Sequence, residues 1–353
     1  MRILQLITEK PPVKTGFARS IGEIVHNFLI NFNHDLQVIS TQDAPTLRIN
    51  KIKFSLIVPK LLFMKKNYDI VHIYGNSPFF SEMCILIFKL FRKKVIYTYH
   101  CDAISSSINN SKNYMGGLFE KIYNKLHSYL LKLCDITTFT SADYAKTRKA
   151  HAKRYFITPL GVNKKFFTNQ SIRDFSKQPR SILFVGQLQH YKGLHLLVKV
   201  AKQFDMIVNI AGKGVLYSEL KRLSKDSPHV KLLGFVPDKK LLELYASHHF
   251  IILPSITASE AFGLVTLEGM AGGCVPITSD LAGVSNLSRE TGYIFKTGDF
   301  DSLTKIFTEI GSITDKELEK RSRASKEFSK EFTWEKCVKR LNAMYNWLLH
   351  QVK

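Results

Sequence analysis

The sequence lacks a long hydrophobic run. None of its apolar stretches approaches the roughly 18–20 residues with which an α-helix spans a bilayer, and the runs at 84–88 and 250–253 have the length of strands or core segments. Glu9 and Lys10 directly follow the apolar N-terminus, so we expect a buried first strand there rather than a signal peptide. The sequence therefore predicts no membrane-spanning helix.

Cysteine is also scarce. The 353 residues include five cysteines, an odd number, and no C-x-x-C pair. This pattern argues against a disulfide-stapled fold and a cysteine zinc site, and it favours reduced thiols in a cytoplasm. The remaining composition, 45% hydrophobic and 23% charged, is that of a globular protein and excludes fibrous or long disordered chains.

Acidic residues are few. The chain has 29 Asp and Glu against 51 Lys and Arg, a formal net charge of +22. The excess is concentrated in residues 1–170, which carry 25 basic and 10 acidic residues. Such a surface suits nucleic acid, anionic lipid or a phosphorylated substrate, and charge alone does not choose among them.

Short β-branched or aromatic runs alternate with stretches of helical periodicity. Most of these runs are apolar throughout, which indicates parallel sheets covered on both faces. We therefore predict an α/β fold with two doubly wound parallel sheets. The predicted strands are residues 3–7, 36–40, 70–74, 95–99, 136–139, 155–158, 181–185, 206–211, 230–233, 250–253, 275–278 and 293–295, and the predicted helices are residues 16–32, 79–91, 117–134, 192–204, 215–225, 239–248 and 263–272. After about residue 300 the pattern is helical to the end of the sequence.

The length of the chain favours two domains. Residues 163–180 are polar and lack periodicity, which is typical of a linker. We predict an N-terminal domain over residues 1–165, a C-terminal domain over 181–330 and a last helix over 331–353 that packs back on the first domain. Its apolar face comprises Trp334, Val338, Leu341, Tyr345 and Leu348.

Glycines and polar residues follow the predicted strands. Doubly wound sheets bind ligands beyond the carboxyl ends of their strands. We therefore expect two polar rims that face an interdomain cleft. The rims comprise Lys14–Gly16, Gly75–Ser77, His100–Asp102 and Thr140–Ser141 in the first half, and Gly186, Lys192–Gly193, Gly212–Gly214, Pro254–Glu260 and Ser279–Ser285 in the second.

One segment carries Glu260 and Glu268 eight positions apart, with Gly263 opening a helix between them. Backbone amides at such a helix start attract a phosphate or a partly negative sugar oxygen. The two carboxylates would lie about 12 Å apart at 1.5 Å per residue, beyond the about 5–9.5 Å of a glycosidase pair. A solvent-facing helix capped by a glutamate is an equally good interpretation of the residue types.

This Glu-x7-Glu segment resembles that of the retaining glycosyltransferases of the family-4 type, whose GT-B fold has two Rossmann-like domains facing a cleft. Other elements match in order over almost the whole chain. The Tyr-His-x-Asp form is most similar to that of mannosyl- and glucosyltransferases. The matching elements are Phe-Val-Gly-Gln-Leu-Gln-His-Tyr-Lys-Gly-Leu at 184–194, Ile-Ala-Gly-Lys-Gly-Val-Leu at 210–216, Asp-Ile-Val-His at 69–72, Tyr-His-Cys-Asp at 99–102 and Thr-Pro-Leu-Gly-Val-Asn at 158–163.

The resemblance implies a hexosyltransferase that needs neither cofactor nor metal and uses a nucleotide-sugar donor, with GDP-mannose or UDP-glucose favoured. The implied catalytic residues are His100 on the donor sugar, Lys192 on the departing diphosphate and Glu260 on the sugar hydroxyls. The implied acceptor contacts are Thr15 and Asp102, and the implied nucleotide-sugar site comprises Gly16, Gly186, Gln187, Lys192, Gly212, Glu260, Ala261, Phe262, Gly263, Leu264 and Glu268, the last on the ribose. His72, within a strand, is interpreted as structural.

The sequence departs from the family pattern in a few places. Gln187 replaces the family arginine, so one partner of the diphosphate is missing. Either Lys192 suffices to neutralise the diphosphate, or another cation such as Lys213 or Lys14 supplies the missing charge, or activity is low. The family's double glycine is Thr15-Gly16 here, and Leu160 replaces a polar residue.

Two basic segments suit an anionic membrane surface. Residues 51–66 contain five lysines and no acid, and residues 112–132 alternate apolar positions with lysines. A core-facing helix with a solvated face is the alternative for each. The charge of the first half and the lipid-linked acceptors that the resemblance implies favour a cytoplasmic protein bound peripherally to the inner face of the cell membrane.

The expected acceptor is a glycan or a lipid-linked oligosaccharide, in surface-glycan or glycoprotein-glycan assembly. Two alternatives keep the fold: a catalytically silent nucleotide-sugar-binding module, of which Gln187 would be the symptom, and a sugar-nucleotide epimerase. A nucleic-acid binder would use the basic half, but the sequence has no helix-turn-helix, zinc finger or RNA-recognition motif. No specific nucleic-acid partner is expected.

Overall fold

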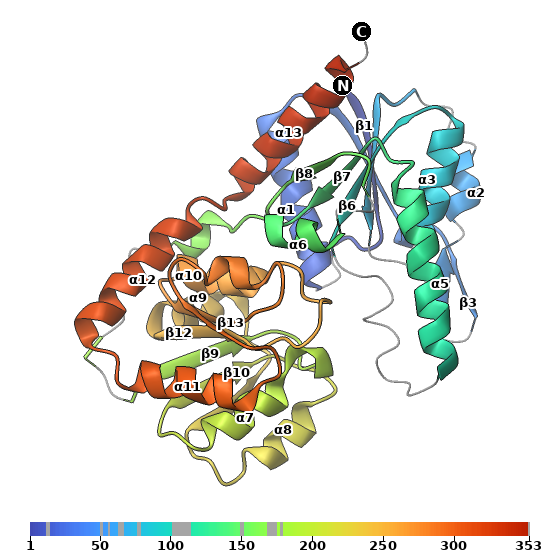
Figure 1. The fold of residues 1–353 in the computed structure, drawn as a ribbon. Helices are drawn as coiled ribbons and strands as arrows, with labels where there is room; N and C mark the ends of the chain where they lie inside the picture. The colour runs from blue at the N-terminus through green and yellow to red at the C-terminus, as the bar shows by residue number, and fades with distance from the viewer. Residues whose placement is uncertain are drawn as a thin grey trace. The chain divides into compact units, whose positions relative to one another are not determined.

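The chain divides into two compact units (Figure 1). The computed structural model describes residues 1–11, 15–49, 52–55, 57–62, 67–75, 79–100, 114–148, 152–167, 175–176 and 179–351. Unit 1 consists of Met1–Gly161 together with Trp334–Lys353, and unit 2 consists of Val162–Thr333. The chain thus leaves unit 1 once and returns to it with the last helix.

Unit 1 is built on a parallel sheet in the order β2-β1-β5-β6-β7-β8. Counted along the chain, the order of these strands is 2-1-3-4-5-6, so it reverses between β1 and β5. That reversal is the topological switch point, beside which doubly wound sheets bind ligands. The strands are β1 (Arg2–Ile7), β2 (Asp35–Ser40), β5 (Ile70–Gly75), β6 (Lys94–Tyr99), β7 (Ile136–Phe139) and β8 (Tyr155–Ile157).

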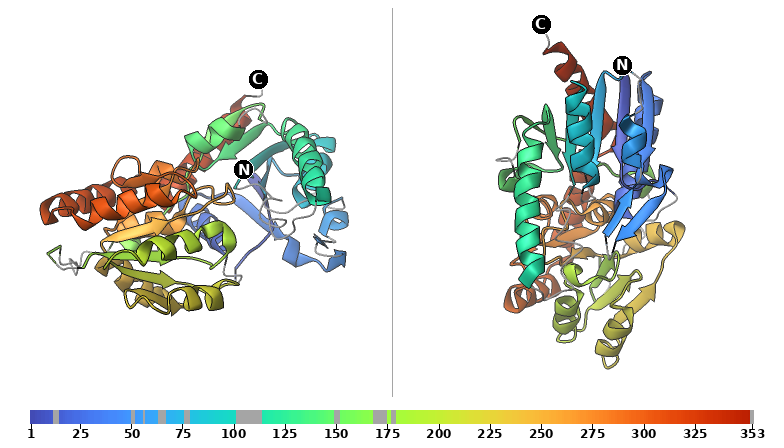
Figure 2. Two further views of the ribbon diagram at one scale, coloured as in Figure 1. Left: turned by 60° about the horizontal axis from the view of Figure 1, so that its bottom comes forward. Right: turned by 90° about the vertical axis from the view of Figure 1, so that its right-hand side faces the viewer.

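Helices cover both faces of the unit 1 sheet (Figures 1 and 2). The first helix, α1 (Gly16–Asn31), packs beside α13 (Trp334–His350) on one face. On the other face α3 (Phe80–Leu90) packs against α2 (Ile57–Leu62) and α5 (Tyr114–Leu131). The unit also contains α6 (Ala142–Arg148) and an antiparallel hairpin of β3 (Thr46–Ile49) and β4 (Ile52–Ser55).

Unit 2 has a parallel sheet in the order β11-β10-β9-β12-β13-β14. Along the chain this is 3-2-1-4-5-6, the dinucleotide-binding order, with its switch point between β9 and β12. The strands are β9 (Ser181–Val185), β10 (Ile207–Ala211), β11 (Val230–Gly234), β12 (Phe250–Leu253), β13 (Val275–Ser279) and β14 (Tyr293–Phe295), and the helices are α7 (Leu194–Ala201), α8 (Tyr217–Leu223), α9 (Asp238–Ser247), α10 (Leu264–Ala271), α11 (Phe300–Gly311) and α12 (Asp315–Ser329).

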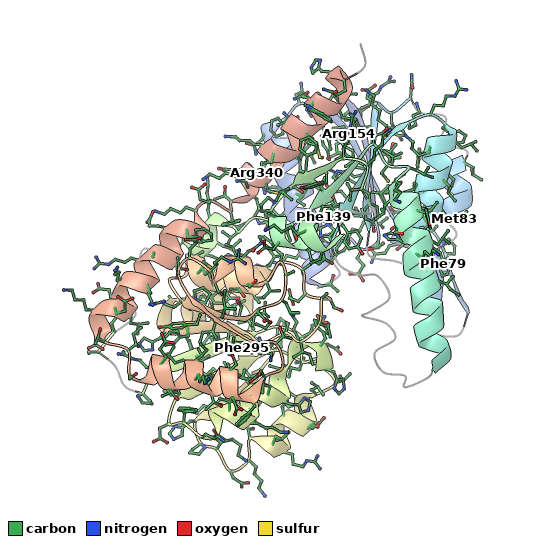
Figure 3. All side chains as sticks on the ribbon, viewed as in Figure 1. Phe79, Met83, Phe139, Arg154, Phe295 and Arg340 are labelled. Carbon is green, nitrogen blue, oxygen red and sulfur yellow. The ribbon has the colours of Figure 1, made fainter. Side chains whose placement is uncertain are left out.

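The predicted fold class is confirmed, and each predicted strand is present to within two residues at its ends. The helices α2 and α6 and the β3–β4 hairpin are not predicted from the sequence. Each sheet is buried as its apolar strands imply: Phe139 on β7 and Phe295 on β14, both labelled in Figure 3, are almost fully buried. Hydrophobic burial on both faces is thus the main source of stability.

The start of unit 2 includes much of the segment that the sequence predicts as a linker. The backbone of Val162 pairs with that of Thr333, where the chain leaves the unit again. The buried Arg180 donates hydrogen bonds to the backbone oxygen of Ile313, at 3.0 Å, and to the carboxylate of Asp315, at 2.6 Å. These polar contacts join the segment to unit 2. Hydrophobic periodicity does not reveal contacts of this kind, because they are made by backbone and polar side-chain atoms.

His72 connects the unit 1 sheet to the C-terminal helix. The imidazole is fully buried on β5, with Nδ1 2.6 Å from the hydroxyl of Tyr345 on α13 and Nε2 2.6 Å from the hydroxyl of Thr98 on β6. Burial lowers the pKa of His72 to about 3. At physiological pH the ring is therefore neutral and forms a hydrogen bond with each of the hydroxyls of Tyr345 and Thr98.

Replacement of His72 tests this connection. His72→Leu should lower the free energy of unfolding by about 2–4 kcal/mol, because Tyr345 and Thr98 each lose a buried hydrogen-bond partner. The double variant His72→Leu/Tyr345→Phe should lose less than the sum of the two single variants, since both partners are then removed. Urea unfolding of the four proteins measures this; additive losses would contradict the interaction.

The same variant carries a pH signature. An unfolded histidine titrates near pH 6.5, so the unfolded chain binds a proton that the folded state rejects. The stability of the unmodified protein should fall as pH drops from about 6.5 towards 3, by about 1.4 kcal/mol per pH unit for this group. His72→Leu should remove that part of the slope.

Candidate functional site

The strongest candidate site lies at the switch point of unit 2, in the loops that follow β9 and β12. The loop after β9 contains a short 3-10 turn, His190–Lys192, and the loop after β12 leads to Glu260. A backbone hydrogen bond joins the two loops, from the Ile256 amide to the Tyr191 oxygen at 2.8 Å. Lys192 and Glu260, 68 positions apart, consequently form an ion pair between Nζ and Oε2.

This ion pair is largely withdrawn from solvent. The side chains of Lys192 and Glu260 are 9% and 15% exposed. Burial by itself lowers the pKa of Lys192, but the charge of Glu260 and the hydrogen bond to it outweigh burial and raise that pKa above its ordinary value. The site thus holds an amine that is protonated at neutral pH, whose charge a diphosphate would match.

Gly263 sets the start of α10 next to this pair. It is the N-cap residue with φ of +82°, a left-handed conformation, and a Cβ at this position would lie 2.8 Å from Leu253 Cδ2. Residues 266–271 of α10 are buried, so the helix faces the core. The interpretation of a solvent-facing capped helix is therefore wrong.

Glu268 is one of these buried residues, with 6% of its surface exposed. The Tyr245 hydroxyl donates a hydrogen bond to its carboxylate at 3.0 Å. A carboxylate is costly to bury without such partners. Its orientation is therefore fixed by α9, which carries Tyr245.

The loops after β9 and β10 interlock through their backbones. Gly186 donates to the Ala211 oxygen, and Leu188 donates to the Lys213 oxygen, both at 3.0 Å. A Cβ on Gly212 would lie 1.8 Å from the Gly186 oxygen, so this close approach requires glycine. The interlock brings Lys213 beside the loop of Gln187, and the side chains of Gln187 and Lys213 are both exposed.

The other predicted donor-site residues surround α10. Ala261 and Phe262 are buried between Glu260 and the helix, and the Phe262 ring packs near Phe332. Leu264 is the first residue of α10 and is half-buried. The structure thus brings the predicted residues of unit 2 together around the carboxyl ends of β9, β10 and β12.

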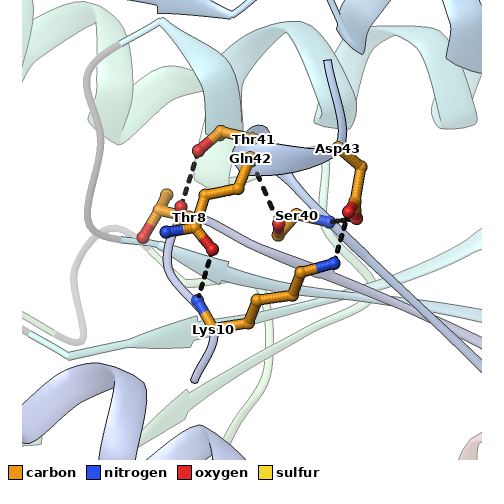
Figure 4. Close-up of polar contacts among 6 residues, drawn as sticks. All are labelled: Thr8, Lys10, Ser40, Thr41, Gln42 and Asp43. Carbon is orange, nitrogen blue, oxygen red and sulfur yellow. Dashed lines mark hydrogen bonds and ion pairs between the residues drawn. The ribbon is translucent and has the colours of Figure 1, made fainter. Parts of the chain in front are cut away.

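In unit 1, polar contacts fix the segment between β1 and α1. Lys10 forms an ion pair with Asp43, and its amide donates to Gln42 at 3.2 Å (Figure 4). The hydroxyl of Thr41 donates to the Thr8 oxygen at 2.6 Å, and the Ser40 side chain accepts from the Gln42 amide. These bonds tie the end of β1 to the end of β2.

Thr15 and Gly16 begin α1. The hydroxyl oxygen of Thr15 accepts a hydrogen bond from the Ala18 amide at 3.1 Å, as an N-cap residue does. The same hydroxyl donates a hydrogen bond to the Glu9 carboxylate at 2.5 Å. A Cβ on Gly16 would meet no atom within 4 Å, so the helix start has space beside it. The predicted role of these residues towards an acceptor stays a prediction.

His100 directly follows β6 and is 8% exposed. The ring of Phe17 meets it edge-on at 5.0 Å, and Tyr74 stacks at 5.8 Å. Burial lowers the pKa of His100 to about 4, and in the part of the chain that the structure describes Nε2 has no hydrogen-bond partner. His100 is thus a neutral imidazole with one unused nitrogen; the predicted Asp102 and Lys14 lie outside the described residues.

Unit 1 also contains a buried polar cluster that is not predicted from the sequence. Glu82 on α3 accepts a hydrogen bond from the Tyr123 hydroxyl and lies 2.5 Å from Nδ1 of His127, both on α5. All three side chains are buried. The signal for this cluster was Glu82 itself, an isolated acid within an otherwise apolar stretch of α3.

Residues 166–329 match the model of the family Glycosyl transferases group 1. The chain is 30% identical over 197 residues to an uncharacterized glycosyltransferase of Methanocaldococcus jannaschii, an alignment that covers 54% of this chain and 53% of that protein. It is 29% identical over 307 residues to the D-rhamnosyltransferase WbpZ of Pseudomonas aeruginosa, which covers 83% and 72% of the two chains. The chain thus spans about half of the first relative and nearly three quarters of the second.

Solved structures share the fold of both units. The sucrose-phosphate synthase of Thermosynechococcus elongatus superimposes with a TM-score of 0.76 at 18% identity, over 99% of this chain and 100% of that one. The Anabaena protein HepE, in complex with UDP and glucose, gives a TM-score of 0.74 at 14% identity, over 98% and 100%. The fold is therefore the GT-B fold.

The coupling within the buried ion pair can be measured directly. Glu260→Gln should cost about 3–5 kcal/mol of unfolding free energy, because Lys192 keeps a buried charge without its partner. The double variant Lys192→Met/Glu260→Gln should be more stable than Glu260→Gln alone. Denaturant unfolding of the single and double variants provides the cycle, and a double variant that is the least stable would contradict it.

Proposed function

We propose that this chain, whose residues 166–329 match the model of the group 1 glycosyltransferases, moves a hexose from a nucleotide-sugar to a glycan or a lipid-linked oligosaccharide. The transfer retains the anomeric configuration and needs no metal or other cofactor. GDP-mannose and UDP-glucose are the favoured donors. The name of the Pseudomonas relative adds a D-rhamnosyl donor to those that need testing.

The observation that carries the proposal is the buried Lys192–Glu260 ion pair beside the start of α10. When the donor reacts, negative charge develops on its leaving diphosphate. A protonated amine and helix amides that are already in place stabilise this charge without reorganising. Glu260, which keeps Lys192 charged, in turn accepts hydrogen bonds from the sugar hydroxyls.

The remaining roles follow the same placement. The buried carboxylate of Glu268, oriented by Tyr245, accepts hydrogen bonds from the ribose hydroxyls. The Anabaena neighbour that holds UDP and glucose supports a nucleoside-diphosphate sugar as the ligand of this fold. In unit 1, neutral His100 offers its unused nitrogen to a sugar hydroxyl, and Thr15 contacts the acceptor.

The chemical step breaks the bond between the anomeric carbon and the diphosphate oxygen. The acceptor oxygen forms its bond to that carbon on the same face, which gives retention. The acceptor proton passes to an oxygen of the departing diphosphate. The pKa of Lys192 is raised, so this residue contributes charge and is not the base.

A donor panel tests the proposal. The purified protein, with and without EDTA, is mixed with GDP-mannose, GDP-D-rhamnose, UDP-glucose, UDP-galactose or UDP-N-acetylglucosamine, together with a membrane-lipid extract. NMR should show release of one nucleoside diphosphate, insensitive to EDTA, and a product with the anomeric configuration of the donor. An inverted product would contradict retention, and a donor converted without acceptor would indicate an epimerase.

Lys192→Met should lower kcat with the preferred donor by about 10²–10³-fold, because the charge acts on the transition state. Lys202→Met, an exposed lysine at the end of α7, is the matched control and should leave kcat unchanged. Nucleotide binding without turnover of any donor in the unmodified protein would identify a silent binding module.

Of the residues that the structure describes, Lys213 is the cation that we expect to supply the charge of the missing family arginine. The backbone oxygen of Lys213 accepts a hydrogen bond from the amide of Leu188, the residue after Gln187. The exposed amine of Lys213 lies over the Phe235 ring, 5.9 Å from the ring centroid. Lys213→Met should therefore lower kcat/KM by about tenfold, and Gln187→Arg should restore it in that background. An unchanged kcat/KM in Lys213→Met would contradict this role of Lys213.

A further inference from the structure

The surface of α3 is unusual for a helix in water. Three of its residues are exposed, and all three are apolar: Met83, Leu86 and Leu90, at spacings of three and four. Leu90 is 77% exposed, and Phe91 directly after the helix is also exposed. Figure 3 labels Met83 on this helix. A solvent-facing helix ordinarily carries polar residues on its outer side.

The neighbouring helix α5 continues the same pattern. Ile122, Leu126 and Tyr129 are 52–59% exposed, and Leu133 just beyond the helix is 45% exposed. These positions are four, three and four residues apart, so they form one stripe along the helix. The exposed Lys125 and Lys132 lie on the same side, and the amine of Lys132 is 5.2 Å from the centre of the Tyr129 ring.

The Glu82 cluster joins the two stripes into one face. Glu82 binds Tyr123 and His127 across the contact between α3 and α5, which lie side by side in Figures 1 and 2. A buried carboxylate is stabilised only by such partners. Each helix also has a buried side, and Leu86 and Leu126 are exposed on the helices that this contact joins.

We propose that this face, comprising Met83, Leu86, Leu90, Phe91, Ile122, Lys125, Leu126, Tyr129, Lys132 and Leu133, docks on an anionic lipid surface. Its apolar side chains would enter the headgroup boundary, and its lysines would reach the phosphates with their stems along the apolar surface. None of the exposed residues that the structure describes within 79–93 and 122–133 is acidic. The charge complements an anionic bilayer.

A second copy of the chain fits this face less well. In a two-fold dimer the same patch faces itself, so Lys125 and Lys132 of both copies would be brought together. Lysine is also depleted from protein–protein interfaces. No helix in the described part of the chain is long and apolar enough to cross a bilayer.

Vesicle binding tests the inference. The full chain is sedimented with vesicles of phosphatidylcholine alone or with 30% phosphatidylglycerol, a composition of about one anionic lipid in three. We expect binding to the anionic vesicles only, weakened at high salt. Leu86→Ser/Leu126→Ser and Lys125→Glu/Lys132→Glu should each weaken it by about tenfold or more.

Matched controls are available elsewhere on the surface. Ile30→Ser changes a 68% exposed apolar residue of α1, and Lys320→Glu reverses an exposed lysine of α12. Both should bind like the unmodified protein. Thermal unfolding checks that each variant is folded, and donor hydrolysis in detergent checks the catalytic unit separately, so a failure of the proposed function does not affect this test.

The inference is overturned if the anionic vesicles do not bind the unmodified protein, or if both face variants bind as well as the two controls. A concentration-dependent dimer in sedimentation velocity that Leu86→Ser/Leu126→Ser abolishes would assign the face to a second copy instead.

Discussion

The candidate site of unit 2 depends on one buried ion pair, that of Lys192 with Glu260. Its two members come from loops that follow different strands, and only the reversal of strand order between β9 and β12 brings those loops together. Gly263 must be glycine for α10 to start where it does next to them. Burial of either charged side chain alone would be destabilising, and the opposite charge of its partner compensates for that cost.

The layers of the fold can be predicted from the sequence because strands that are buried on both faces appear as continuous runs of apolar residues. Strands such as residues 250–253 contain only large apolar residues, and every strand of this kind is found. The β3–β4 hairpin is not predicted because basic residues lie among the apolar residues of its strands. That pattern is also typical of a basic amphipathic segment. Strand order also escapes: nothing in the composition separates the 2-1-3-4-5-6 order of unit 1 from the 3-2-1-4-5-6 order of unit 2.

The site is predictable in part for the same reason. Motifs locate Glu260, Glu268 and Lys192 because each follows a strand or opens a helix. Their partners are not local: Tyr245 lies on another helix, and the unused nitrogen of His100 depends on what packs around it. Burial of α10, which excludes a merely capping role for its glutamate, is a property of the tertiary structure. Residue type and spacing alone therefore left that alternative open.

The course of the chain has a consequence for how the protein is made. Unit 2 is an insertion within unit 1, because the final helix α13 returns to pack on α1 and to satisfy His72 through Tyr345. A ribosome delivers those last residues only after all of unit 2 has emerged. Unit 1 can therefore complete its fold only after unit 2 has been synthesised, when Tyr345 becomes available to His72. Unit 1, whose synthesis begins first, is therefore the second of the two units to be completed.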